Sequence, residues 1–128
     1  MDEFIRVESS LSVEQAVEKV QEASKANGFG VLNTLNLQQI MAGKGVNYAE
    51  AATVVEICRP GDAKTFLDAD QRVAPCLPCR IAVTTQGGKT IVHTVRPSAM
   101  MRMFQNEKLE APAKAVDEVI EKIINAAR

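Results

Sequence analysis

Aromatic residues are scarce in this chain. They make up 4% of the sequence, with four phenylalanines, one tyrosine and no tryptophan. The hydrophobic core must therefore be built almost entirely from aliphatic side chains.

The sequence also lacks a charge excess and long apolar runs. Fifteen basic and sixteen acidic residues give a net charge of −1, which argues against nucleic acid as a partner because phosphate binding needs basic surface. No stretch approaches the roughly 20 apolar residues that cross a bilayer. The first ten residues, MDEFIRVESS, do not resemble a signal peptide. We therefore expect a cytoplasmic protein that does not contact membranes.

Cysteine and histidine are few. The three cysteines are Cys58, Cys76 and Cys79, and the single histidine is His93. An odd number of cysteines fits reduced thiols better than a disulfide framework. With 128 residues, 46% of them hydrophobic, the chain is long enough to fold as one domain over residues 1–128 without crosslinks.

The hydrophobic pattern alternates between strand and helix periods. Strands are expected at 3–8, 28–36 and 52–59, and in two runs between 80 and 97. Helices are expected at 12–28, 37–45, 61–70, 98–104 and from about 112 to 127. Ser12 and Gln15 are spaced as a capping box. Gly87-Gly88 predicts a two-residue hairpin turn that places Val83 opposite Val92.

This order of elements predicts an α/β (α+β) fold. We expect a single two-layer domain with helices packed on one face of a mixed β-sheet. The long connections between the early strands suit crossovers to parallel neighbours, whereas the hairpin strands must be antiparallel.

The Cys76-Leu77-Pro78-Cys79 motif has the letters of a thiol-disulfide oxidoreductase site. In those enzymes the motif opens a helix that lowers the thiol pKa, whereas here it runs directly into a strand. A reversible redox sensor stays open as an alternative. Cys58 has the stronger case for a reactive thiol, since it ends a buried strand just before a helix. The alternative is that it packs as a small apolar residue.

A metal site can be assembled from the three cysteines and His93, as a Cys₃His zinc set. The hairpin register argues against it, because His93 shares a sheet face with Ala82 whereas Cys79 falls on the other face. A three-thiolate site for a soft metal stays open. Met100, Met101 and Met103 could ligate copper or haem iron, although the helical spacing of Met100, Met103 and Phe104 favours packing in the core or at a dimer interface. His93 has no neighbouring serine or acid motif that would make it a general base.

Three segments resemble a known family. The stretches ANGFGVLN, EICRPGDAKTFLDAD and LPCRIAVT, together with the order of elements, are similar to the small bacterial and archaeal domain of unknown function 302 family. Cys58 and Cys79 match the family's two cysteine positions, Pro60 is displaced by one residue, and Cys76 is not part of the pattern. The resemblance covers nearly the whole chain and implies a two-layer α/β fold, commonly a homodimer, without an agreed activity.

These observations lead to three functional hypotheses. The first is a homodimeric protein that binds a small molecule in a pocket near Cys58, Pro60, Pro78 and Cys79. The second is a thiol redox, sulfur-handling or soft-metal or haem-binding protein that uses Cys76 with Cys79 and Cys58. The third is an interaction module that works through its dimer surface. The sequence identifies no cofactor and no catalytic residue.

Overall fold

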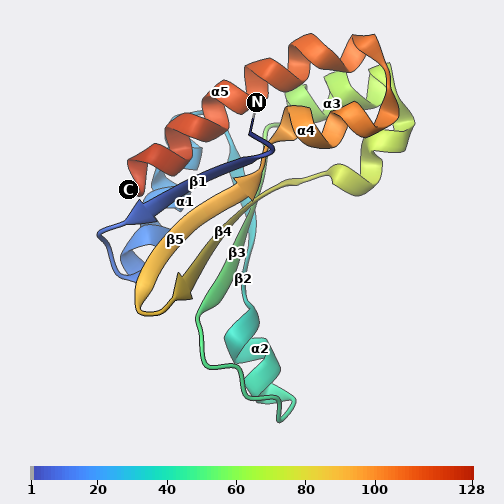
Figure 1. The fold of residues 1–128 in the computed structure, drawn as a ribbon. Coiled ribbons are helices and arrows are strands. Elements are labelled where there is room, and N and C mark those ends of the chain that lie inside the picture. Colours follow the sequence, from blue (N-terminus) through green and yellow to red (C-terminus); the bar gives the residue numbers. More distant parts are fainter. Residues whose placement is uncertain (1) are drawn as a thin grey trace.

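The computed structural model describes residues 2–128 and contains one five-stranded sheet (Figure 1). The strands lie in the order β1-β5-β4-β3-β2, and all four neighbouring pairs are antiparallel. Their bounds are β1 Phe4–Ser9, β2 Gly30–Asn36, β3 Ala52–Cys58, β4 Cys79–Gln86 and β5 Lys89–Val95. The expected two-layer α/β fold is confirmed, but the expectation of a mixed sheet was wrong. The crossover from β1 to β2 spans the whole sheet, so these two strands form opposite edges and no parallel neighbours arise.

The hairpin of β4 and β5 has the predicted register. Val83 pairs with Val92, and Ala82 pairs with His93. Gly87 and Gly88 both have positive φ angles, 57° and 82°, which side chains with a β-carbon adopt only at a cost. This turn therefore sets which residues of both strands face the helices.

Residues 2–128 form five α-helices and three 3-10 turns besides the sheet. The α-helices are α1 Val13–Ala26, α2 Leu37–Gly43, α3 Pro60–Ala69, α4 Pro97–Met101 and α5 Glu110–Ala126. The 3-10 turns are η1 Gln71–Cys76, η2 Arg102–Phe104 and η3 Glu107–Leu109. The capping box of Ser12 and Gln15 is present at the start of α1.

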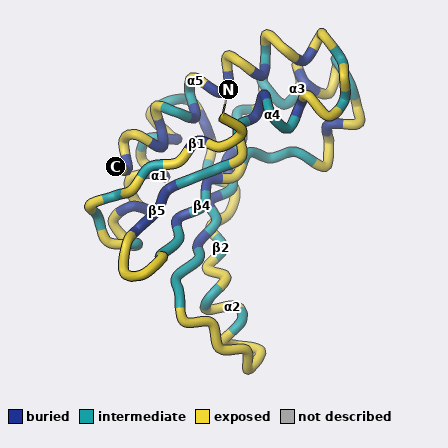
Figure 2. Tube along the Cα trace, in the orientation of Figure 1, coloured by how far each residue is buried: buried dark blue, intermediate teal, exposed yellow. Residues whose placement is uncertain are grey.

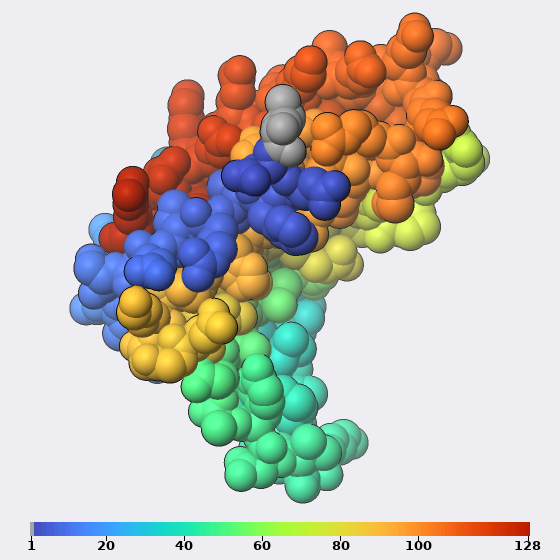
Figure 3. Space-filling model, viewed as in Figure 1, coloured from blue at the N-terminus to red at the C-terminus, as the bar shows by residue number. Residues whose placement is uncertain are grey.

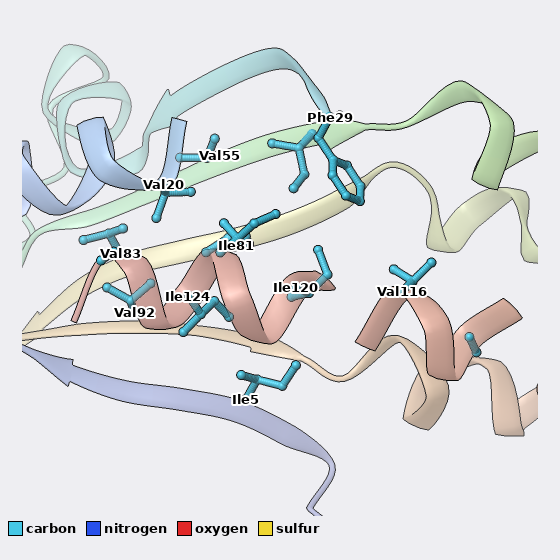
Figure 4. Packing of buried hydrophobic residues seen from close by; sticks show 14 of the residues in the cluster. Ile5, Val20, Phe29, Val55, Ile81, Val83, Val92, Val116, Ile120 and Ile124 are labelled. Atoms are coloured by element: carbon cyan, nitrogen blue, oxygen red, sulfur yellow. The ribbon is translucent and has the colours of Figure 1, made fainter. Parts of the chain in front are cut away.

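The core lies between the sheet and the two long helices α1 and α5 (Figure 4). Val55, Val83 and Val92 project from three adjacent strands and are fully buried. Val20 from α1 and Ile124 from α5 meet them and are also fully buried. As the scarcity of aromatic residues predicts, nearly every large core side chain is aliphatic; the aromatic exceptions are Phe29, just before β2, and Phe66 of α3.

Within residues 2–128, no helix covers the opposite face of the sheet (Figure 1). Alternation places Arg6, Ala82 and Val54 on this face, along one row with His93. Ala82, Val54 and His93 are half-buried there by their neighbours on the sheet. The domain therefore presents a broad open sheet face.

The segment 37–50 forms an arm that projects from the end of the sheet (Figures 1 and 3). Its helix, α2, has no buried residue. Ile40, Val46 and Tyr48 on the arm are 51%, 53% and 46% exposed, and Figure 2 shows the exposed colour along its tip. The arm thus carries apolar side chains that nothing in the described chain covers.

No helix within residues 2–128 combines the length and the apolar character needed to cross a bilayer.

Candidate functional site

Cys58 and Cys79 meet at one end of the sheet because β3 ends where β4 begins. Ile57 pairs with Cys79 across these strands, and both cysteines line one small cavity together with Pro78. The cavity volume is about 10 Å³, which is the room of about one water molecule. The structure thus brings together three of the four residues predicted to bind a ligand.

The other two residues of the predicted sites lie apart from this cavity. Pro60 is the first residue of α3 and does not line the cavity. Cys76 ends η1 and packs, half-buried, against the hydrophobic core. A cis peptide bond joins Leu77 to Pro78 in the turn between Cys76 and Cys79.

The Cys79 thiol is held in its protonated form. Burial raises its pKa from 9.0 to about 11, and the negative charge of Asp62 and the nearby Cys58 thiol add to this shift. Arg59 and Arg80 oppose the shift without cancelling it. Since the thiolate is the nucleophile, Cys79 has little nucleophilic character at neutral pH, a property that the sequence reasoning did not anticipate.

Arg59 closes the side of this cavity. Its Nε donates to Oδ2 of Asp62 over 2.6 Å, and its Nη1 donates to the carbonyl oxygen of Asn27 over 3.2 Å. The guanidinium carbon lies 4.8 Å from the centre of the Phe29 ring, a cation–π distance. The side chain thereby ties α3 to the end of α1 and to the start of β2.

The predicted metal sites do not assemble. Among residues 2–128, no three His, Cys, Asp or Glu side chains converge to hold a metal ion. His93 lies on the opposite sheet face from Cys79, as its register predicts, and its Nε2 lies 3.0 Å from Oγ1 of Thr84. Burial, with a contribution from the positive charge of Arg6, lowers the His93 pKa, which favours the neutral ring.

The methionine segment 100–103 does not form one continuous α-helix, although its spacing suggested one. α4 ends at Met101 and continues as the 3-10 turn η2. Met101 enters the core at 4% exposed, whereas Met103 is 69% exposed. Met103 is therefore not part of the core of the single chain, because the tighter turn rotates it toward solvent.

A larger cavity lies between α4 and α5. It has a volume of about 400 Å³, within the range of small-molecule sites. Met101, Leu109 and Ala113 supply apolar lining, and all three are at least 96% buried. The space is therefore of ligand size, unlike the void between the cysteines.

A polar network lies beside this cavity, which Ser98 lines. Asp117 accepts hydrogen bonds from the backbone N–H of Ser98 over 2.9 Å and from its hydroxyl over 2.5 Å. Arg96 lies beside Asp117, with Nη1 4.0 Å from Oδ2 of Asp117 and 2.6 Å from Oε1 of Glu121. These contacts hold α4 against α5, the two helices that flank the cavity.

Comparison with known protein families shows to which family the chain belongs. Residues 5–127 match the family described as domain of unknown function DUF302. The chain belongs to this family. The crystal structure of an uncharacterized conserved DUF302 protein from Bacillus stearothermophilus superposes with a TM-score of 0.95, with 23% identity and with 100% of both chains covered. At that identity the likeness shows the fold alone. Comparison with curated proteins gives no match.

The α4–α5 cavity of this DUF302 domain was missed by the sequence reasoning. One signal was present, because Asp117 falls on the apolar stripe formed by Ala113, Ile120 and Ile124 on the last helix. A carboxylate on such a stripe needs a buried partner. The partner, Ser98, is 19 residues away in sequence and belongs to a helix of only five residues.

Proposed function

We propose that this protein is a homodimeric small-ligand-binding domain whose ligand lies in the groove between α4 and α5. The cavity of about 400 Å³ carries this proposal, since it combines ligand-sized volume, apolar lining and polar groups. The cysteine cavity has room for about one water, so we favour the α4–α5 groove over the site near Cys58, Pro60, Pro78 and Cys79.

The exposed arm and the open sheet face support the dimer. A seven-residue helix is too short to be stable in water by itself, and no residue of α2 is buried in the single chain. Leu37 and Ile40 of that helix are 37% and 51% exposed. Contact with a second copy would remove these apolar side chains from water. We place the dimer in the cytoplasm, where three free thiols remain reduced.

The ligand site is tested by blocking the groove. Ala113, 1% exposed, lies in the lining, so Ala113→Leu should fill space that a ligand needs. Ala115→Leu adds the same bulk at an exposed position of α5 and is the matched control. We expect thermal-shift screening with a panel of small metabolites to find compounds that stabilise the wild type and Ala115→Leu but not Ala113→Leu.

Native mass spectrometry under reducing conditions supplies the second measurement. We expect two chains per particle, with a small bound mass that Ala113→Leu lacks. A monomer contradicts the dimer. The absence of bound mass, together with no stabilising compound, contradicts the ligand function.

Thiol chemistry is the second candidate, and one observation favours it. Cys58 and Cys79 line the same cavity, and each thiol is free. An oxidant that entered there could join them in a disulfide and release two protons and two electrons. Titration of thiols before and after mild oxidation by hydrogen peroxide tests this: a loss of two thiols that requires both Cys58 and Cys79 supports it, and three unchanged thiols refute it.

A further inference from the structure

The groove between α4 and α5 is lined by charged groups of both signs. Arg102 and Lys114 contribute two positive charges, and Glu107 and Glu110 contribute two carboxylates. Throughout the described part of the chain, no ion pair includes any of these four side chains. All four are therefore available to a ligand in the groove.

The balance of these charges constrains the ligand. A simple anion would meet two carboxylates, and a simple cation would meet two positive side chains. A molecule with one charge of each sign gains attraction from both sets, and like-charge contacts are avoided. The apolar lining of Met101, Leu109 and Ala113 adds a preference for an aliphatic body.

The helix spacing constrains the distance between the ligand's charges. Glu110 and Lys114 are four residues apart on α5, so they lie on one face of the helix with β-carbons about 5–6 Å apart. Consecutive Cα atoms of a peptide are about 3.8 Å apart, so the terminal ammonium and carboxylate of a dipeptide can be separated by a similar distance. In a single amino acid both groups share one carbon and lie closer together.

We propose that the groove binds a short zwitterionic peptide with aliphatic side chains, its ammonium group at Glu110 and its carboxylate at Lys114. This inference rests on the proposed ligand-binding function and names its ligand class. Arg102 adds attraction for the carboxylate and Glu107 adds attraction for the ammonium group. Ser98 does not donate to the ligand's carboxylate, because its hydroxyl proton is already donated to Asp117.

The test compares three probes that differ in charge. Leucyl-leucine carries both charges, N-acetyl-leucyl-leucine lacks the ammonium group, and leucyl-leucinamide lacks the carboxylate. Isothermal titration calorimetry should show leucyl-leucine binding about fivefold more tightly than either analogue, the effect of one partly exposed ion pair.

Charge variants assign each preference to a residue. Lys114→Gln should reduce the preference for leucyl-leucine over the amide, leaving only the part that Arg102 supplies, and should keep the preference over the acetylated probe. Glu110→Gln should do the reverse. Lys122→Gln, at an exposed position on the same helix outside the groove, should keep both preferences.

The outcomes separate this inference from the proposed function. Equal binding of all three probes, lost in Ala113→Leu, overturns the zwitterionic ligand while the groove stands as a binding site. Tighter binding of one singly charged analogue than of leucyl-leucine also overturns it. If none of the probes binds, the peptide class is refuted, and the compound screen and native mass then decide the proposed function separately.

Discussion

The raised pKa of Cys79 predicts a stability that falls in alkaline solution. The folded pKa is about 11 against an ordinary value of 9.0. Because the folded value is the higher one, the contribution of this thiol to stability is fully present below pH 9 and is lost as the pH rises toward 11. At pH 10 the unfolded thiol is mostly ionised and the folded thiol is mostly protonated, a difference of about 1.4 kcal/mol.

The perturbation that isolates this contribution is Cys79→Ala. Other groups, such as lysines and Tyr48, also titrate at this pH, so the wild type and the variant must be compared in the same buffers. Urea unfolding followed by circular dichroism at pH 7.5 and pH 10 gives both free energies. We expect the wild type to lose about 1.4 kcal/mol more than Cys79→Ala between the two values. An equal loss in both proteins would refute the reasoning.

Alkylation provides an independent measure of the same pKa. In a variant with Cys58 and Cys76 changed to alanine, iodoacetamide can react only with Cys79. This variant keeps burial, the largest cause of the raised pKa, and loses only the smaller contribution of Cys58. Only the thiolate reacts, so at pH 8 the reactive fraction should be about 100-fold below that of a thiol with a pKa of 9. The rate should keep rising about tenfold per pH unit beyond pH 9. A plateau near pH 9 would show that burial does not shift this thiol.

Three further predictions concern the polar network, the arm and the first helix. Asp117→Ala leaves the buried N–H and hydroxyl of Ser98 without an acceptor, so it should lower the free energy of unfolding in urea titration by about 2–4 kcal/mol. The exposed control Glu118→Ala should change the free energy of unfolding by less than about 0.5 kcal/mol. Equally small effects of both variants would exclude a structural role for the network. If the arm forms the proposed dimer interface, Ile40→Asp should convert the proposed dimer to a monomer in light scattering without loss of helix content, and an unchanged dimer mass would remove the arm from that interface. Ser12→Ala should cost about 1 kcal/mol by removing the N-cap of the first helix, and thermal melts without a shift would show that this cap is dispensable.

Local sequence patterns were sufficient to predict most elements of the fold. The capping box at Ser12, the turn at Gly87-Gly88 and the alternation in the hairpin each depend on residues close together in the chain. Such features follow from backbone preferences and side-chain alternation, and the structure confirms them. The opposite faces of Cys79 and His93 followed from the same alternation.

The sheet topology and the candidate sites depended on contacts between distant segments. Local patterns cannot tell whether strands joined by a helix become neighbours or opposite edges, since both arrangements bury the same apolar residues. The volume beside Cys58 and Cys79, the raised pKa of Cys79 and the groove between α4 and α5 arise from side chains that meet only after packing. Sequence alone thus determined an aliphatic α/β domain with Cys58 and Cys79 at strand ends. Tertiary structure decided that these two thiols enclose little space and that the larger cavity lies between α4 and α5, because cavity volume and desolvation depend on how the packed elements meet.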